Sequence, residues 1–241
     1  MAFAQQHGLL VIEDEAQGIG VTYRGRHVGA IGDVGCFSFF ADKTITTGEG
    51  GYVTCRDQEI YNRLRLLRNQ GRLDRGSFIH PAIGFNFRIT DIQGAIGLVQ
   101  LTKLDEIKRR KTHHLNRYRE GLKALDAVRF LNVEPGSSYV PFRCVIMCES
   151  LGALMPFLED CGIQTRSFFY PLHKQPCFNG LPSLKAGAVS LDDRDYPNSV
   201  DGYAHGLCLP ISPGLADHDV DVVVTAIRKF YEADPDAAQN E

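Results

Sequence analysis

Ser38 and Lys43 stand five positions apart on a segment that ends in glycines, GDVGCFSFFADKTITTGEGG at residues 32–51. A lysine amine can condense with a carbonyl group and a serine hydroxyl can bind a phosphate, so the pair suits a phosphorylated carbonyl cofactor. Gly48 and Gly50 allow the positive φ or the close backbone approach that such a loop needs. A nucleotide P-loop is excluded because its lysine follows its glycines. The ordinary alternative is that Lys43 is a solvated surface lysine.

A carboxylate follows the apolar run that precedes this segment. Residues 9–12 (LLVI) are continuously apolar, which predicts a strand buried on both faces of a parallel sheet. Asp14 comes just after this run, and ligands of open α/β sheets bind at the carboxyl ends of strands. A carboxylate there could keep a pyridinium nitrogen protonated. The residues alone leave open the simpler alternative that Asp14 caps a turn.

Several motifs occur in the order and spacing of one enzyme family. The pattern D-x-A-Q at residues 14–17, FSFF at 37–40, Lys43 and TTGEGG at 46–51 resemble the DegT/DnrJ/EryC1/StrS family of sugar aminotransferases. GFNFRITDIQGAIGLVQL at residues 84–101 and FFYPLHKQP at 168–176 extend the resemblance to nearly the whole chain. The resemblance implies the α/β fold of type I pyridoxal-phosphate-dependent transferases. That fold would comprise a cofactor domain with a mixed or parallel sheet, here incomplete, and a smaller α+β C-terminal domain.

The resemblance implies a set of residues that hold pyridoxal 5'-phosphate. Lys43 would bind the cofactor covalently and later move a proton between the cofactor and substrate carbons. Asp14 would pair with the pyridinium nitrogen, Gln17 would hydrogen-bond the phenolic oxygen, and Ser38 would bind the phosphate. A relative in which histidine replaces the lysine is a dehydratase, so Lys43 argues against that activity.

The resemblance also implies contacts to a partner subunit and to the substrate. Asn86 would reach the phosphate of the cofactor in the neighbouring subunit of a homodimer, and Arg88 and His173 would bind the substrate. The motifs are most similar to members that aminate a GDP-linked 4-keto-6-deoxy sugar, with L-glutamate as the amino donor. A TDP- or UDP-linked keto sugar is the alternative substrate. Three arginines could contact a nucleotide diphosphate or form a solvated face, namely Arg68, Arg72 and Arg75.

Apolar periodicity predicts an α/β region followed by an α+β region. Helical spacing indicates helices at residues 58–69, at 90–111 with Thr90 as the N-cap, and at 113–125, 151–161 and 217–231. Strands are predicted at residues 52–55, 139–148, 164–169 and 208–213, a hairpin within 18–32, and a disordered tail from 233. We therefore assign residues 1–111 to the remainder of the cofactor domain and residues 112–241 to a small C-terminal domain.

Composition narrows the class of protein. The 241 residues are 44% hydrophobic with a net charge of −3 and no large basic run, which gives no support for nucleic acid as a partner. Neither a continuous membrane-spanning run nor a secretory signal is present, so we expect a cytoplasmic protein. The seven cysteines form no C-x-x-C pair, which predicts mostly reduced core thiols and no metal site.

The start of the chain is unusual for the family. Residues 1–8 (MAFAQQHG) indicate the end of a helix that Gly8 terminates, and the apolar run follows at once. Relatives reach this point only after a longer N-terminal segment. We therefore expect an N-terminally truncated enzyme, and the alternative is a non-catalytic fragment of such an enzyme.

Overall fold

A computed structural model of the chain describes residues 1–73, 76, 78–178 and 190–233. Arg75 and the tail predicted after residue 233 lie outside the described residues. The chain forms two compact units, each described here on its own. The first comprises Met1–Arg110 and Val133–Phe142, and the second comprises Lys111–Asn132 and Arg143–Glu241.

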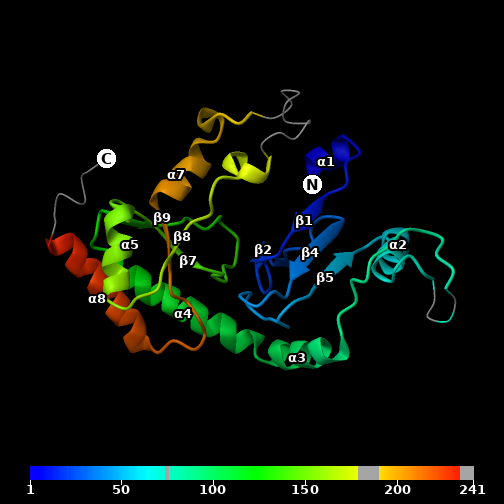
Figure 1. Cartoon of the computed structure of the whole chain (residues 1–241), viewed down its shortest axis with the longest axis horizontal. Coiled ribbons are helices and arrows are strands. Elements are labelled where there is room, and N and C mark those ends of the chain that lie inside the picture. The colour runs from blue at the N-terminus through cyan, green and yellow to red at the C-terminus, as the bar shows by residue number, and fades with distance from the viewer. Residues whose placement is uncertain (74–75, 77, 179–189, 234–241) are drawn as a thin grey trace. The chain divides into compact units, whose positions relative to one another are not determined.

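The first unit contains a mixed sheet of three strands, which follows the short helix α1 (Ala2–Gln6) (Figure 1). The strand order is β1 (Ile12–Asp14), β4 (Val34–Ser38) and β5 (Gly51–Cys55), with β1 parallel and β5 antiparallel to β4. The prediction of a buried strand at residues 9–12 is wrong, because β1 begins at Ile12 and Leu10 and Ile12 are 72% and 70% exposed. The apolar run is exposed because β1 has a strand partner on only one side among the described residues.

The predicted hairpin is confirmed as β2 (Thr22–Tyr23) and β3 (Arg26–His27). The two turn residues, Arg24 and Gly25, both have positive φ, as a tight two-residue hairpin turn requires. The segment after the hairpin is held by Glu13 on β1, whose carboxylate accepts hydrogen bonds from the N–H groups of Gly29, Ile31 and Gly32. Partial burial raises the pKa of the Glu13 carboxyl, but these donors and the charge of Arg26 lower it by more, so the pKa lies below its ordinary value.

Three helices follow the sheet along the chain. The predicted first helix is confirmed as α2 (Gln58–Arg68), which Asp57 caps by accepting from the N–H of Ile60. The helix predicted at residues 90–111 is instead two helices, α3 (Asp91–Thr102) and α4 (Leu104–Leu122), separated at Lys103. Thr90 caps α3 as predicted, with Gln93 completing a capping box. Helix α4 runs on through residue 111, so no helix boundary marks the predicted domain boundary.

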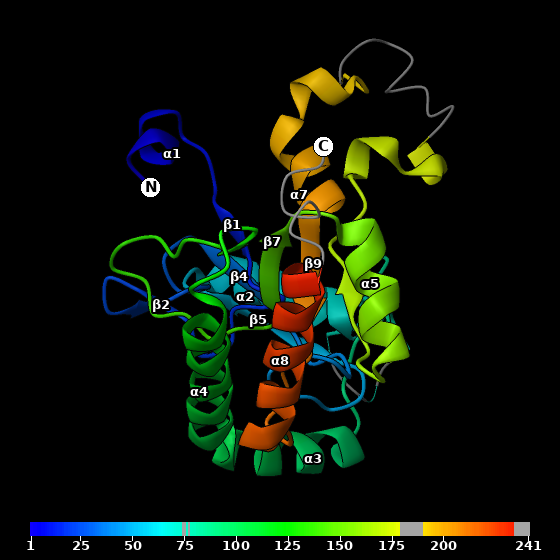
Figure 2. The same ribbon diagram turned by 90° about the vertical axis from the view of Figure 1, so that its left-hand side faces the viewer.

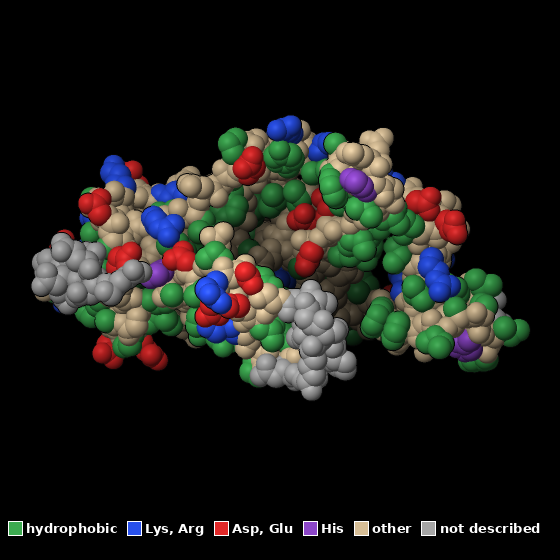
Figure 3. All heavy atoms as spheres, turned by 90° about the horizontal axis from the view of Figure 1, so that it is seen from above, with side chains coloured by type: hydrophobic (Ala, Val, Ile, Leu, Met, Phe, Trp, Pro, Cys, Tyr) green, Lys and Arg blue, Asp and Glu red, His purple; other side chains and the backbone are tan. Residues whose placement is uncertain are grey.

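The first unit buries little apolar surface of its own. Its core cluster consists of Ile19, Phe37, Ile45 and Ile107. The apolar side chains of α3 are exposed, with Ile92 at 76% and Leu98 at 68%. Green hydrophobic side chains also reach the surface on the face drawn in Figure 3. The described residues of this chain therefore leave the apolar side of α3 uncovered.

The second unit is a four-stranded antiparallel sheet covered by helices (Figure 2). The strand order is β6 (Val128–Phe130), β7 (Cys144–Cys148), β9 (Gly206–Leu209) and β8 (Arg166–Ser167). Helix α8 (Asp217–Ala233) lies between α4 and α5 (Leu151–Asp160), as Figure 2 shows. The core joins these elements through fully buried side chains, among them Tyr118, Leu122, Ile146, Leu154, Leu158, Leu207 and Ile227.

Several predictions for the second unit need correction. The strand predicted at residues 139–148 begins only at Cys144, and residues 133–142 pack with the first unit. Strand β6 and helix α7 (Pro197–His205) were not predicted. The 3₁₀ turns η1 (Leu172–Lys174), η2 (Pro176–Phe178) and η3 (Asp193–Asp195) were not predicted either. Helices α5 and α8 are confirmed to within two residues of their predicted ends.

All seven cysteines are free thiols, but only Cys144, Cys148 and Cys208 are buried. The prediction that most are core thiols is therefore wrong, since two of the others are exposed and two are half-buried. Burial raises the pKa of the Cys144 and Cys148 thiols, which keeps them protonated at neutral pH. Within the part of the chain that the structure describes, no helix combines the length and the apolar character needed to cross a membrane.

Candidate active site

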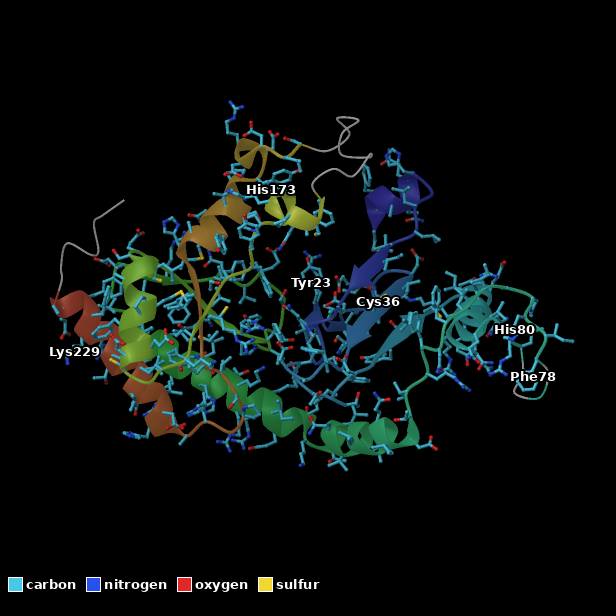
Figure 4. All side chains as sticks on the ribbon, viewed as in Figure 1. Tyr23, Cys36, Phe78, His80, His173 and Lys229 are labelled. Atoms are coloured by element: carbon cyan, nitrogen blue, oxygen red, sulfur yellow. The ribbon has the colours of Figure 1, made fainter. Side chains whose placement is uncertain are left out.

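Asp14 and Ser38 lie at the same edge of the mixed sheet. Strands β1 and β4 are parallel, with Asp14 paired to Cys36, and Ser38 is the last residue of β4. Figure 4 labels Cys36 on this strand. The N–H of Glu15 donates to the carbonyl of Cys36 at 2.9 Å, which fixes the chain just beyond Asp14. Carboxyl ends of adjacent parallel strands are the usual ligand-binding edge of an α/β sheet.

The carboxylate of Asp14 is exposed and only partly engaged. Its Oδ1 accepts from the N–H of Ala16 at 3.2 Å, so the turn-capping role left open by the sequence does occur. Its Oδ2 accepts no hydrogen bond from the described residues. Gln17 is exposed in the turn that follows, closed by the bond from the N–H of Gly18 to the carbonyl of Glu15. Both side chains are therefore free to bind a ligand at this edge.

The loop that carries Lys43 folds back onto the end of β4. The N–H of Phe39 donates to the carbonyl of Gly50 at 2.8 Å, and the N–H of Thr47 donates to the carbonyl of Phe39 at 3.0 Å. Gly50 has φ +135°, and a Cβ there would lie 2.9 Å from Thr47 Oγ1, so glycine is required at this position. Both ends of the loop are thus anchored beside Ser38, and Lys43 is held at the same edge as the two polar strand ends.

The Lys43 amine contacts an aromatic ring. Its Nζ lies 4.5 Å from the centroid of the Phe142 ring, and no carboxylate of the described residues lies within ion-pair distance of it. The neighbouring Thr44 Oγ1 is buried without a hydrogen-bond partner among the described residues. No pattern in the sequence pointed to Phe142, because it is far along the chain in a segment that was predicted to be a strand.

Two glutamines of α3 support the loop from its other side. Gln93 Nε2 donates to the carbonyl of Glu49 at 2.9 Å, and Gln100 Oε1 accepts from the N–H of Thr46 at 3.3 Å. Residues seven apart lie on one face of a helix, so one polar face of α3 holds the glycine-rich turn. This role was not predicted, because the apolar spacing that predicts the helix carries no information about its polar face.

Asn86 and Arg88 lie on the segment between α2 and α3, and both are exposed. Asn86 forms an isolated antiparallel bridge with Asn69, and the N–H of Phe85 donates to the carbonyl of Leu67 at 2.7 Å. These bonds attach the segment to the end of α2. No contact among the described residues joins Asn86 or Arg88 to Lys43, and their roles stay predictions.

His173 belongs to η1 of the second unit, where Figure 4 labels it. Its Nε2 lies 3.0 Å from Asp193 Oδ1, its ring stacks on Tyr196 at 4.4 Å, and its side chain is 4% exposed. Lys174 Nζ donates to the other oxygen of Asp193 at 2.9 Å, and Lys174 and then His173 lower the pKa of Asp193. In this structure His173 ties η1 to η3, and the predicted contact with substrate stays a prediction.

The residues at the sheet edge fit a pyridoxal phosphate cofactor. The ends of β1 and β4 and the loop between β4 and β5 supply a partly engaged carboxylate, a hydroxyl and an amine that has no ion-pair partner among the described residues. The buried hydroxyl of Thr44, which has no partner among the described residues, is a further polar group that a ligand could satisfy. An α/β sheet edge that gathers an amine, a carboxylate and a hydroxyl has the groups that such a cofactor requires.

The chain belongs to the DegT/DnrJ/EryC1/StrS aminotransferase family, whose model matches residues 1–228. Members of this family are pyridoxal-phosphate-dependent sugar aminotransferases. The chain is 36% identical over 233 residues to GDP-perosamine synthase of Caulobacter vibrioides, covering 93% of this chain and 59% of that enzyme. It is 34% identical over 233 residues to GDP-perosamine synthase of Vibrio cholerae, covering 94% of this chain and 60% of that enzyme. The chain therefore spans about three fifths of the length of these curated relatives.

Solved structures share the fold. The structure of DesV from S. venezuelae matches with a TM-score of 0.86 at 30% identity, covering 100% of this chain and 61% of that one. The aminotransferase TlmJ from Streptoalloteichus hindustanus matches with a TM-score of 0.85 at 29% identity, covering 96% of this chain and 61% of that one. The predicted family is confirmed, and the fold class is confirmed as a mixed α/β fold shared with sugar aminotransferases over that length.

Proposed function

We propose that this chain carries the catalytic lysine of an aminotransferase that acts on a nucleotide-linked 4-keto-6-deoxy sugar, with L-glutamate as the amino donor. The observation that carries the proposal is the attachment of the Lys43 loop to the sheet edge where Asp14 and Ser38 end their strands. Pyridoxal phosphate, when bound, supplies an electron sink for the substrate carbon.

Each residue at the edge has a distinct chemical task. Lys43 forms the covalent attachment point and afterwards moves the proton at the substrate carbon through its Nζ. Asp14 holds positive charge on the ring nitrogen through Oδ2, which accepts no hydrogen bond from the described residues, because a carboxylate favours the protonated partner. Ser38 donates its hydroxyl to the phosphate, since its Oγ already accepts from the N–H of Phe40 at 3.1 Å. Gln17 hydrogen-bonds the phenolic oxygen.

Sequence identities of 36% and 34% to two GDP-perosamine synthases support a GDP-linked substrate. A TDP- or UDP-linked keto sugar is the alternative within the same activity. Because the chain spans about three fifths of these enzymes, a non-catalytic piece of such an enzyme is the second candidate function. The assignment of residues 1–111 and 112–241 to separate domains and the cytoplasmic location stay predictions.

A homodimer with a shared site is part of the proposal. The uncovered apolar side of α3 supports it, because exposed apolar faces of this kind mark protein interfaces. Asn86 lies just before that helix and is exposed, which a residue that reaches into a partner subunit must be.

Chemical trapping of the cofactor tests the proposal. The purified chain is incubated with pyridoxal phosphate, its visible absorption recorded, and the product reduced with borohydride before peptide mapping. We expect a defined absorption band and label on Lys43. Lys43→Arg should abolish both, while the control Lys103→Arg, at the end of α3, should leave both unchanged. Label spread over several lysines, or unchanged label in Lys43→Arg, contradicts the cofactor assignment and favours the non-catalytic alternative.

A further inference from the structure

A pocket of about 410 Å³ lies beside the C-terminal half of α2, entirely within the first unit. Four arginines from three segments line it, together with two asparagines, namely Arg65, Arg68, Arg72, Arg88, Asn62 and Asn69. The first three arginines come from α2 and the turn after it, and Arg88 comes from the segment before α3. Figure 4 labels Phe78 and His80 on the chain that connects these segments.

The pocket carries a concentrated positive charge. Residues 60–72 include four arginines and neither aspartate nor glutamate. No carboxylate of the described residues lines the pocket, and none lies within ion-pair distance of its four guanidinium groups. Arg65 and Arg68 also lie in the last turn of α2, where the helix dipole favours cations. That effect does not explain Arg72 and Arg88, which converge on the same space from outside the helix.

Two buried polar atoms of the pocket residues have no partner among the described residues. Arg72 Nε is a donor without an acceptor, and Asn69 Oδ1 is an acceptor without a donor. The Arg72 side chain is held in place, because its guanidinium donates to Gln70 Oε1 at 2.6 Å and lies 5.6 Å from the Phe78 ring centroid. Buried polar groups are normally hydrogen-bonded, so these two atoms call for a ligand that both accepts and donates.

We propose that this arginine pocket binds the diphosphate of a nucleotide-linked ligand. Guanidinium groups match phosphate oxygens in a two-point geometry, and their charge does not depend on pH in the physiological range. A hydroxyl of the same ligand supplies the donor that Asn69 Oδ1 lacks. A pocket of this volume lies within the range that small-molecule sites occupy. The inference rests on the proposed nucleotide-sugar substrate and assigns the part of it that the pocket recognises.

Calorimetric titration of the full chain with GDP, and separately with guanosine, tests the inference without any cofactor. The test variant is Arg68→Gln combined with Arg72→Gln, and the matched control is Arg63→Gln, on the same helix but outside the pocket lining. We expect GDP to bind more tightly than guanosine. The double variant should lose about tenfold or more in affinity, and the control should stay near the unmodified chain. The affinity for GDP should also fall as salt is raised.

Two further measurements distinguish a loss of GDP binding from a loss of the folded structure. Thermal unfolding midpoints of the double variant and the control are compared first. Arg72→Lys serves as a second variant. It keeps the positive charge but lacks the guanidinium group that makes two parallel hydrogen bonds, so it should bind GDP with intermediate affinity. The inference is overturned if GDP does not bind, if guanosine binds as tightly, or if the double variant matches the control. Because Lys43 labelling does not depend on these arginines, labelled Lys43 without GDP binding refutes the pocket alone. GDP binding without labelled Lys43 refutes the proposed function alone.

Discussion

The substitution Glu13→Gln should destabilise the first unit, because one carboxylate holds three backbone donors. Glu13 Oε2 accepts from the N–H of Gly29 at 2.8 Å, and Oε1 accepts from the N–H groups of Ile31 and Gly32 at 2.8 and 2.5 Å. A glutamine amide has only one oxygen. If that oxygen replaces Oε1, the N–H of Gly29 faces an NH₂ group and loses its acceptor.

The magnitude follows from this geometry. A donor left without an acceptor costs about 1–3 kcal/mol, and the other two bonds lose the strengthening that a charged acceptor gives. We expect Glu13→Gln to lower the free energy of unfolding by about 2–3 kcal/mol at pH 7. In the opposite orientation of the amide, two N–H donors would lack an acceptor, and the loss of unfolding free energy would be larger. The control Glu134→Gln removes an exposed carboxylate of the same unit and should change stability by less than about 0.5 kcal/mol.

The pH dependence of the free energy of unfolding tests the Glu13 hydrogen bonds independently. The pKa of Glu13 is lower in the folded chain than its usual value, so its ionisation stabilises the fold above the unfolded pKa of about 4.3. This contribution is lost as the pH falls from that value through the folded pKa. Urea unfolding followed by circular dichroism should therefore show a smaller loss on acidification in Glu13→Gln than in the unmodified chain. Equal stability at pH 7, or an equal acid loss in both proteins, would refute the reasoning.

Three further substitutions test the site and the interface. Ser38→Ala should weaken the binding of pyridoxal phosphate about tenfold in an absorbance titration while Lys43 is still labelled at saturation, because one hydrogen bond from the hydroxyl to the charged phosphate is lost. Unchanged affinity would remove Ser38 from the cofactor site. Gly50→Ala should cost about 1–3 kcal/mol in urea unfolding and reduce labelling of Lys43, because φ is +135° and the new Cβ would crowd Thr47 Oγ1; an unaffected variant would show that the loop tolerates a side chain. Leu98→Lys places a charge on the exposed apolar side of α3 and should shift the sedimentation profile toward a monomer. The control Lys103→Glu should leave the profile unchanged. Identical profiles for the two variants would argue against this face as the dimer interface.

Features set by local sequence were predictable. The capping box of Thr90 and Gln93 lies within four residues, and the turn at Arg24 and Gly25 needs only its own backbone. Helix α8 was predicted because its buried valines recur at helical spacing. The family motifs placed Asp14, Ser38 and Lys43 on strand ends and a loop, and their common edge follows from the parallel pairing of β1 with β4.

Features set by distant contacts were not predictable from one sequence. The apolar run at residues 9–12 looked like a buried strand, because periodicity reports side-chain character but not whether a covering layer is present. The break at Lys103 interrupts a continuous helical pattern, where Thr102 Oγ1 donates back to the carbonyl of Val99 at 2.8 Å. The ring of Phe142 lies beside Lys43 through a fold-back of the chain that no local pattern encodes.

Because the segment Val133–Phe142 belongs to the first unit, no single cut in the chain separates the two units. The backbone passes from one unit to the other after Arg110, after Asn132 and again after Phe142. A protease cut or a gene split near residue 111 would leave the ring that contacts Lys43 with the other half. The Lys43 loop is therefore not a self-contained piece of sequence, and an insertion between these crossings could alter the surroundings of the Lys43 amine.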